Sequence, residues 1–240
     1  MNIYMLNKST VLSDEQIQAW LPAFNKFVDH VRYYWPRPAH LIWCPKEHEP
    51  VEAWKVVFLD DSDQAGALAY HGLTPGGKPI SSVFARTEMK NGYSVTVSAC
   101  HEIAEMIADP WIADAVQVSN QYFYAKEICD PVESDSDGYE ISVPGFEPVL
   151  CSNFVTPYWF SPGEVDGVLD HCRKLTKPLE LLKGGYMSVC PVGRGGWTPI
   201  YAEEQGYGKP ALGLHTTKFT GGYGRLERYG RERGDHPTVF

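Results

Sequence analysis

The sequence predicts an α+β domain with a small mixed sheet. Three observations lead to this class: an amphipathic helix near the N-terminus, several short strand-like segments after it, and a largely apolar helix near the middle of the chain. The 240 residues are enough for one large domain or two small ones, and 43% of them are hydrophobic, which allows a sizeable core. We therefore expect two helices packed on a sheet, followed by an irregular C-terminal extension.

The first expected element is a helix that begins after Ser13. Ser13 is a typical N-cap residue, and Gln16 stands where it can complete a capping box. The apolar residues that follow recur at helical spacing: Ile17, Trp20, Leu21, Phe24, Phe27, Val28 and Val31. We expect Pro22 to bend this helix or to delay its start, and we expect the helix to end before Pro36.

Short segments rich in β-forming residues come next, separated by Pro, Gly and Asp clusters. They cover residues 40–44, 55–59 and 80–85, which we expect to be strands of one sheet. Residues 122–129 and 139–143 have the same strand-like character, with a turn rich in Ser, Asp and Gly between them. Beyond these segments Pro and Gly become dense, and from Lys183 onward little periodicity remains.

The central helix is expected over residues 95–108. The period of the sequence changes here, and Ala, Ile, Met and Glu favour a helix. Asp109 and Pro110 mark its end. Because most of its residues are apolar, we expect much of this helix to be buried.

Acidic residues outnumber basic ones, 30 against 21, which gives a formal charge of −9. This balance makes a nucleic-acid partner unexpected. No apolar stretch approaches the roughly 18 residues that span a bilayer, and residues 1–10 do not resemble a secretory signal. We expect a cytoplasmic protein with no membrane partner, whose six dispersed cysteines are free thiols.

One part of the central helix carries residues suited to metal chemistry. On a helix, His101 and Glu105 are four residues apart and project from the same face, so both can reach one cation. Glu102 lies one step round, where it could reach a water molecule at that cation. A solvated helix face is the ordinary alternative for such a pair. The apolar neighbours favour burial, and buried carboxylates are costly without a cation or hydrogen bonds.

Further carboxylates lie on the next strand-like segment. A catalytic zinc site needs three protein ligands and one open position. Either Asp130 or Glu127 would complete the set that His101 and Glu105 begin, and the choice between them stays open. Zinc is the expected metal, with Ca²⁺ or Mn²⁺ as alternatives because an oxygen-rich shell suits them.

These motifs resemble those of a family of largely uncharacterised zincin-like proteins from bacteria and their phages. The family's helix reads Ser-His-Glu-Leu-x-Glu-x-x-x-Asp-Pro, and residues 101–110 match its core. A Glu-x-x-Asp follows, matched by Glu127 and Asp130, and then an aromatic Pro-x-Trp segment, matched by residues 157–159. The similarity covers roughly residues 12–162.

The resemblance implies a zincin-like metal-binding domain over residues 1–182. Residues 183–240 are then a Gly- and aromatic-rich extension, whose tail carries four arginines within residues 221–234. The fold expected from this resemblance is a small mixed sheet with an N-terminal helix and an active-site helix. Residues 80–86 would be the edge strand that binds an extended substrate.

The implied activity is that of a metal-dependent hydrolase, a peptidase that acts on a peptide or protein substrate. Glu102 would be the general base for a metal-activated water. Tyr124, Tyr158 and His71 are candidate donors for the oxyanion, and we include Tyr158 with Glu102 among the expected catalytic residues.

A second interpretation belongs to another class of protein. Glu105 replaces the second histidine of the zincin motif, and its negative charge would make a bound zinc ion a weaker Lewis acid. The chain could therefore be a phage virion or assembly protein that keeps a metal-stabilised zincin scaffold without catalysis. Its C-terminal extension would then contact partner subunits, and its location would be the host cytoplasm or the virion.

Overall fold

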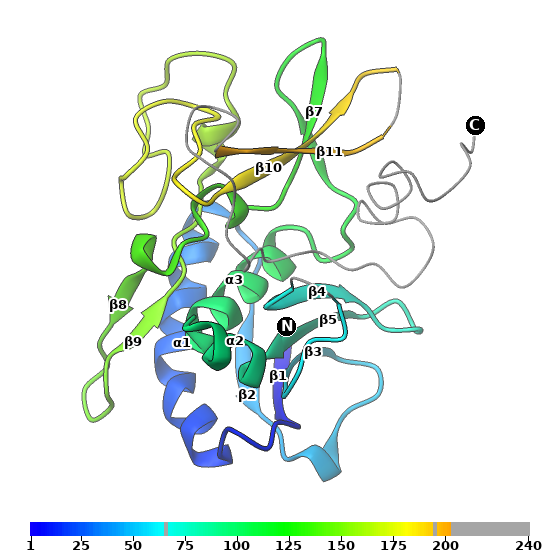
Figure 1. Ribbon diagram of the computed structural model, residues 1–240, viewed down its shortest axis with the longest axis vertical. Helices are drawn as coiled ribbons and strands as arrows, with labels where there is room; N and C mark the ends of the chain where they lie inside the picture. The colour runs from blue at the N-terminus through cyan, green and yellow to red at the C-terminus, as the bar shows by residue number, and fades with distance from the viewer. Residues whose placement is uncertain (65–66, 194–195, 203–240) are drawn as a thin grey trace.

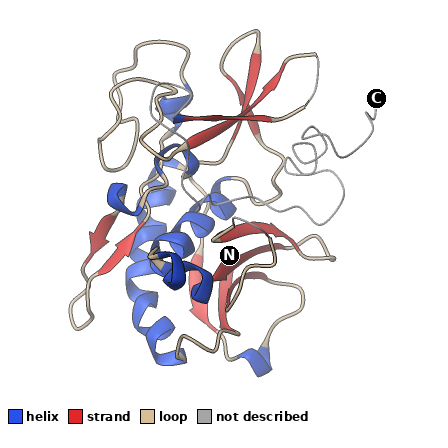
Figure 2. Ribbon diagram, in the orientation of Figure 1, coloured by secondary structure: helices blue, strands red, loops and turns tan. Residues whose placement is uncertain are grey.

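The computed structural model describes residues 1–64, 67–193 and 196–202, and it confirms the α+β class. Its centre is a five-stranded sheet in the order β2-β1-β3-β5-β4 (Figures 1 and 2). The strands are β1 (Asn2–Asn7), β2 (His40–Trp43), β3 (Trp54–Leu59), β4 (Ala69–Leu73) and β5 (Pro79–Phe84).

The sheet is mixed, as expected. β1 pairs in parallel with β2 and with β3, and β3 pairs in parallel with β5. β4 runs antiparallel to β5 and forms the edge, because the tight turn over residues 74–78 folds the chain back on itself. Gly77 has a φ of +73° in this turn, a conformation that favours glycine.

The expected edge strand was therefore wrong. Residues 80–84 belong to β5, which lies inside the sheet between β3 and β4, and Arg86 lies in the short helix α2 (Ala85–Asn91). The edge strands of this sheet are β2 and β4, and it is β4, beside β5 and α3, that contains His71. It carries a Gly and a His within five residues, so it lacks the apolar alternation that marks most strands.

Helix α1 (Asp14–Tyr34) packs along the sheet and holds much of the core. Ser13 and Gln16 form the predicted capping box, in which the Ser13 hydroxyl accepts from the Gln16 amide at 3.2 Å. The helix starts at Asp14 and includes Pro22, so the expectation of a delayed start was wrong. Five residues of the predicted stripe are buried: Ile17, Phe24, Phe27, Val28 and Val31. Trp20 and Leu21 are only partly buried, and Ala23, outside the predicted stripe, is buried as well.

Helix α3 (Val95–Ala108) has the bounds that the sequence predicts, and it lies against β4, β5 and α1. The Ser94 hydroxyl caps its N-terminus, and Asp109 follows its last turn. Every residue from Val97 to Ala108 is buried, which confirms the expected burial. Apolar packing thus fixes this helix, with its polar residues included, inside the core.

A second sheet covers one end of the molecule, above the first in Figure 1. Its order is β11-β10-β7-β6, and the separate hairpin of β8 and β9 lies beside α1 and α3. These strands are β6 (Ala115–Gln117), β7 (Tyr122–Ala125), β8 (Tyr139–Ile141), β9 (Val149–Cys151), β10 (Tyr186–Pro191) and β11 (Thr198–Tyr201).

Several regions differ from the sequence prediction, β4, β6 and β9 among them. β1 was not predicted, although it is the strand between β2 and β3. The chain after Lys183 was expected to be irregular, yet β10 pairs antiparallel with β7 and β11 pairs with β10. These strands form by pairing between residues far apart in the sequence, and the pattern of a single segment does not show such pairing. The arginine-containing tail lies outside the described residues.

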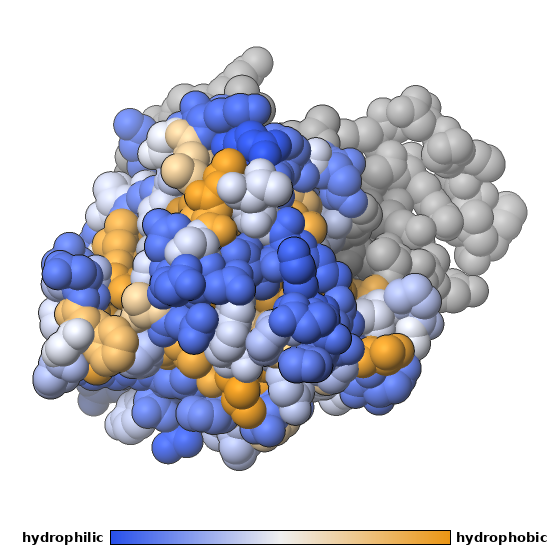
Figure 3. All heavy atoms as spheres, turned by 90° about the horizontal axis from the view of Figure 1, so that it is seen from below, coloured by the Kyte–Doolittle hydropathy of each residue, from blue (hydrophilic) through white to orange (hydrophobic). Residues whose placement is uncertain are grey.

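Three further observations concern the surface and the cysteines. The face seen in Figure 3 is mainly hydrophilic, with small separate hydrophobic areas. In the part of the chain that the structure describes, no helix is both long and apolar enough to cross a membrane. All six cysteines are free thiols, as expected, and five of them are buried.

Candidate metal centre

Three parts of the chain bring polar side chains to one buried place. Helix α3 contributes His101, Glu102 and Glu105, and the edge strand β4 contributes His71. The third part is the segment that follows β7 and includes the 3₁₀ helix η2 (Asp130–Val132). We call this group the buried cluster, and its members are His71, His101, Glu102, Glu105, Glu127, Asp130 and Glu133. Each member is at most 7% exposed.

The first half of the cluster surrounds His101. Its Nε2 atom lies 3.3 Å from Glu105 Oε1, as the four-residue spacing on a helix predicts. The same atom lies 3.1 Å from Asp130 Oδ1. Ligand atoms of Glu133 lie close to those of His101 and Asp130, so these three residues could hold a cation together.

The second half surrounds His71, which packs against the same helix from the sheet side. His71 Nδ1 lies 3.2 Å from Glu102 Oε2 and 3.5 Å from Glu105 Oε2. These three residues form a second group able to hold a cation. The other ring nitrogen, Nε2, lies 3.9 Å from Glu127 Oε2.

The structure therefore separates the two carboxylates that the sequence left as alternatives. Asp130 lies beside His101, while Glu127 lies beside His71 on the far side of its ring. The Cys129 amide, between them in sequence, donates to Glu105 Oε1 at 3.1 Å. This hydrogen bond fixes Glu105 between the two imidazoles, so the segment after β7 both supplies and orients carboxylates.

The charged groups of the buried cluster strongly shift one another's pKa values. Burial alone would lower the pKa of His71, but Glu102, Glu127 and Glu105 outweigh it and raise the pKa to about 9. Burial would raise the pKa of Glu105, yet the two imidazoles and the Cys129 amide lower it to about 2. The imidazoles and carboxylates thus stabilise one another's charged forms. A cation must compete with the protons on both imidazoles, so its affinity falls as the pH falls.

The carboxylates of Glu102 and Asp130 respond mainly to burial. Burial raises the pKa of Glu102 above its usual value, and the hydrogen bond with His71 offsets this only in part. Burial and the charge of Glu105 raise the pKa of Asp130 well above its usual range, against the effect of His101. Packing so many carboxylates out of water is unfavourable unless positive charge accompanies them, which a cation supplies.

The donor set fits a metal ion by distance as well as by charge. Ligands held at about 2.0–2.2 Å in a tetrahedral shell lie roughly 3.3–3.6 Å apart. The imidazole–carboxylate distances of 3.1, 3.3, 3.2 and 3.5 Å are close to this spacing. Imidazole suits zinc, whereas an excess of carboxylate also suits manganese or calcium. These residues therefore suit a divalent cation, but they do not distinguish zinc from manganese or calcium.

The expected tyrosines lie elsewhere. Tyr158 belongs to the 3₁₀ helix η4 (Pro157–Phe160) and is 46% exposed. Its backbone amide donates to the Thr156 hydroxyl, and within the described part of the chain no hydrogen bond or ion pair joins it to the cluster. Tyr124 is half-buried in β7. Tyr186 of β10 is the tyrosine beside the cluster: burial, then the charges of Asp130 and Glu133, raise the pKa of its phenol well above the usual value.

Sequence reasoning missed Tyr186, underrated Glu133 and gave His71 only a possible role as a donor. Strand pairing brings Tyr186 and His71 to the site from distant parts of the chain, so no local spacing marks them. For Glu133 a signal existed. It lies three residues after Asp130, so the turn of η2 keeps the two side chains near each other.

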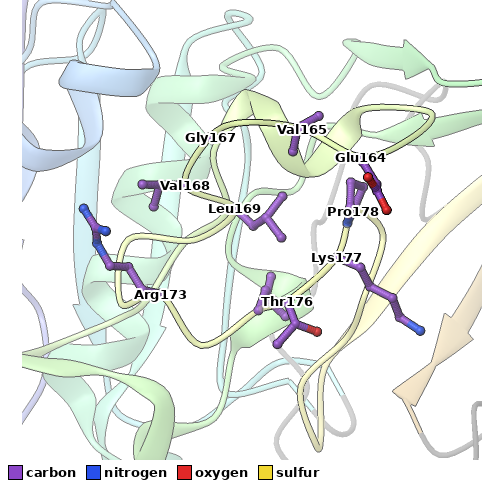
Figure 4. Close-up of a pocket in the computed structure, with 10 residues that line it drawn as sticks. Glu164, Val165, Gly167, Val168, Leu169, Arg173, Thr176, Lys177 and Pro178 are labelled. Carbon is purple, nitrogen blue, oxygen red and sulfur yellow. The ribbon is translucent and has the colours of Figure 1, made fainter.

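A separate cavity lies among the loops of residues 164–178 and has a volume of about 490 Å³ (Figure 4). Its walls combine apolar residues with Arg173, Lys177 and Glu164. None of its lining residues belongs to the buried cluster. This cavity is therefore distinct from the candidate metal centre.

Gly185 packs closely against the backbone of η2 and so provides a first test of the candidate metal centre. A Cβ atom at this position would lie 2.4 Å from the Pro131 carbonyl oxygen and 2.9 Å from that of Asp130. Because both contacts are with backbone, Gly185→Ala must displace η2. We expect a loss of about 1–3 kcal/mol in unfolding free energy and weaker metal binding, measured by urea unfolding and metal titration. Gly163→Ala is the matched control, since open space surrounds that exposed glycine. Equal stability of the two variants would contradict the prediction.

Glu88 of α2 gives a second test, through the pH dependence of stability. It is fully buried, and burial together with the charges of Asp135 and Glu102 raises its pKa to about 8. The folded chain therefore keeps a proton that the unfolded chain releases above about pH 4.5, so this group lowers stability as the pH rises towards 8.

Glu88→Gln should remove that dependence. The variant should gain stability relative to the wild type by roughly 1 kcal/mol per pH unit between pH 5 and 8, as measured by urea unfolding. The exposed Glu147→Gln serves as control. A difference between Glu88→Gln and wild type that stays constant over this range would refute the assignment.

The chain matches no family model, and comparisons with curated proteins and with solved structures find no match. The resemblance to zincin-like proteins therefore rests on the motifs in the sequence.

Proposed function

We propose that this protein is a metal-dependent hydrolase of the zincin-like type that cleaves peptide bonds. One observation carries the proposal: on the buried helix α3, His101 and Glu105 meet Asp130 around one atom, His101 Nε2, at 3.3 and 3.1 Å. Glu102 is the adjacent residue of the same helix. This set provides three metal ligands and a neighbouring carboxylate, which is the minimum a catalytic site of this type requires.

A zinc ion held by these ligands, or Mn²⁺ or Ca²⁺ in its place, would supply a Lewis acid for the scissile carbonyl and acidify a water molecule. Glu102 would be the residue that accepts a proton from a water molecule at this site. His71, 3.2 Å from Glu102 Oε2, orients this carboxylate. Burial raises the pKa of Glu102 above its usual value, which makes its carboxylate a stronger base.

Other residues have proposed roles in substrate binding. The edge strand β4 lies next to α3, so an extended peptide added to it would pass close to His71. Tyr186, buried beside Asp130, keeps its phenolic proton and can donate it to an oxyanion. It is a better placed donor than the exposed Tyr158, whose role stays a prediction.

A second candidate function has an observation in its favour. The cluster residues are between 0% and 7% exposed, which is less than a site that admits a polypeptide requires. A metal-stabilised scaffold without catalysis would need no access from solvent. In that case the protein would be a virion or assembly component, and residues 183–240 would contact its partner subunits.

The first experiment tests both candidates. Protein purified without chelator is analysed for bound metals, then incubated with a broad peptide library whose products are read by mass spectrometry. The hydrolase proposal predicts bound metal, cleavage, loss of cleavage on chelation and recovery when the metal returns. Bound metal without any cleavage would refute the hydrolase and support the scaffold. Absence of metal would refute both.

A further inference from the structure

We propose that the buried cluster binds two divalent cations and that Glu105 bridges them. His101 and Asp130 belong to the first cation, and His71 and Glu102 belong to the second. The inference deepens the proposed function and rests on it for the first cation only. The zincin motif itself accounts for one ion, so the second is a property of this chain's own residues.

The two oxygens of Glu105 face different imidazoles. Oε1 lies 3.3 Å from His101 Nε2, and Oε2 lies 3.5 Å from His71 Nδ1. A carboxylate placed between two nitrogen ligands can give one oxygen to each of two cations. Bridged cations of this kind lie about 3.5–4 Å apart. The glutamate that stands in place of the second zincin histidine therefore has a use that a histidine could not serve, since an imidazole presents a single nitrogen to the site.

His71 supplies an independent observation. Its side chain is fully buried, and its Nε2 makes no hydrogen bond with any described residue. Its Nδ1 faces carboxylate oxygens of Glu102 and Glu105 at 3.2 and 3.5 Å, and acceptor atoms this close together need a proton or a cation among them. With a cation at Nδ1, Nε2 carries the proton and faces the Glu127 carboxylate at 3.9 Å. Metal-binding histidines commonly present their other nitrogen to a carboxylate, so Glu127 is a positioning residue for His71 rather than a ligand.

The ligand sets are similar on the two sides. Each has one imidazole, a share of Glu105, and one further carboxylate within 3.2 Å of the imidazole, Asp130 on the first side and Glu102 on the second. Glu133 lies close enough to join the first set. Glu102 turns Oε2 towards the second cation and keeps its other oxygen for a water molecule, and a cation at Oε2 would make this carboxylate a weaker base than burial alone does.

The charge of the cluster agrees with two cations. With both imidazoles neutral as ligands, two divalent cations balance four of the five carboxylate charges and leave one. Buried groups of like charge repel strongly in a medium of low dielectric constant. Two cations therefore relieve most of the repulsion among the buried carboxylates.

The test is metal stoichiometry, which does not depend on catalysis. Chelated wild-type protein is titrated with Mn²⁺ or Zn²⁺, and the bound metal is counted by elemental analysis after removal of free metal. We expect two cations per chain for the wild type and one for His71→Gln. His48→Gln, at an exposed histidine, should keep both. One cation per wild-type chain, or two that persist in His71→Gln, would overturn the proposal.

Electron paramagnetic resonance of the Mn²⁺-loaded wild type gives a second readout, independent of whether the variant folds. Two bridged ions should give a spin-coupled spectrum, whereas separate ions give the ordinary six-line signal, which would refute the bridge. The two proposals fail in different ways. Two coupled cations without peptide cleavage would refute the hydrolase alone, and one cation with cleavage that depends on Glu102 would refute the second site alone.

Discussion

Replacing Glu102 by Gln is expected to lower peptide hydrolysis by about 10³-fold. The glutamine has the size and shape of the glutamate, but it cannot take a proton from water. The cation bound by His101, Glu105 and Asp130 should remain, because Glu102 is not among its ligands. The loss should therefore appear in kcat, with at least one metal ion per chain still present by elemental analysis.

The control for this experiment is Glu140→Gln, which changes an exposed glutamate of β8 by the same chemistry. It should leave hydrolysis unchanged. Thermal melting of both variants checks that they fold, since Glu102 also contacts His71. Full activity in Glu102→Gln would show that Glu102 is not the general base, even if the protein proves to be a metal-dependent hydrolase.

Replacing His101 by Ala is expected to have the largest effect on the metal centre. His101 Nε2 is the atom on which Glu105 and Asp130 converge, so its loss removes the only nitrogen of the first ligand set. Metal affinity should fall by at least about 100-fold, since the loss of a mere supporting group already costs 10–100-fold.

The same change should lower thermal stability. A cation present at 100 times its Kd stabilises the folded state by about 3 kcal/mol, which corresponds to roughly 5–10 °C in Tm for a chain of this size. Wild type treated with chelator should show a similar decrease, whereas His48→Ala should not. A wild-type Tm that does not respond to chelator would argue that no cation contributes to stability, and full metal content in His101→Ala would exclude His101 as a ligand.

Sequence patterns within a few residues predicted helices α1 and α3 and the His101 half of the buried cluster. The capping box at Ser13 and the Asp109-Pro110 stop act within a few residues, so the bounds of α1 and α3 could be predicted closely. The contact of His101 with Glu105 follows from helical geometry alone. The proximity of Asp130 could be anticipated only as one of two choices, because it depends on how the chain returns to α3 after β7.

The other half of the site could not be predicted in this way. His71 reaches Glu102 because β4 pairs with β5 and both strands pack on α3. Tyr186 reaches Asp130 because β10 pairs with β7, although about sixty residues separate the two strands in sequence. Such contacts depend on the whole sheet, and a single sequence carries no spacing that reports them. The same reason explains why β1 and β4 were missed.

Because the six cysteines are free thiols, interactions other than disulfides must hold distant parts of the chain together. No disulfide joins the described parts of the fold, yet cations in the buried cluster would link three distant stretches, at residue 71, at residues 101–105 and at residues 130–133. Such coordination acts as a removable cross-link, which restricts the unfolded chain as a disulfide does but needs no oxidising surroundings. Helix α3 can form from local contacts, and cations would add to the packing and hydrogen bonds that already join β4 and the segment around η2 to it. Metal would therefore strengthen the attachment of these stretches.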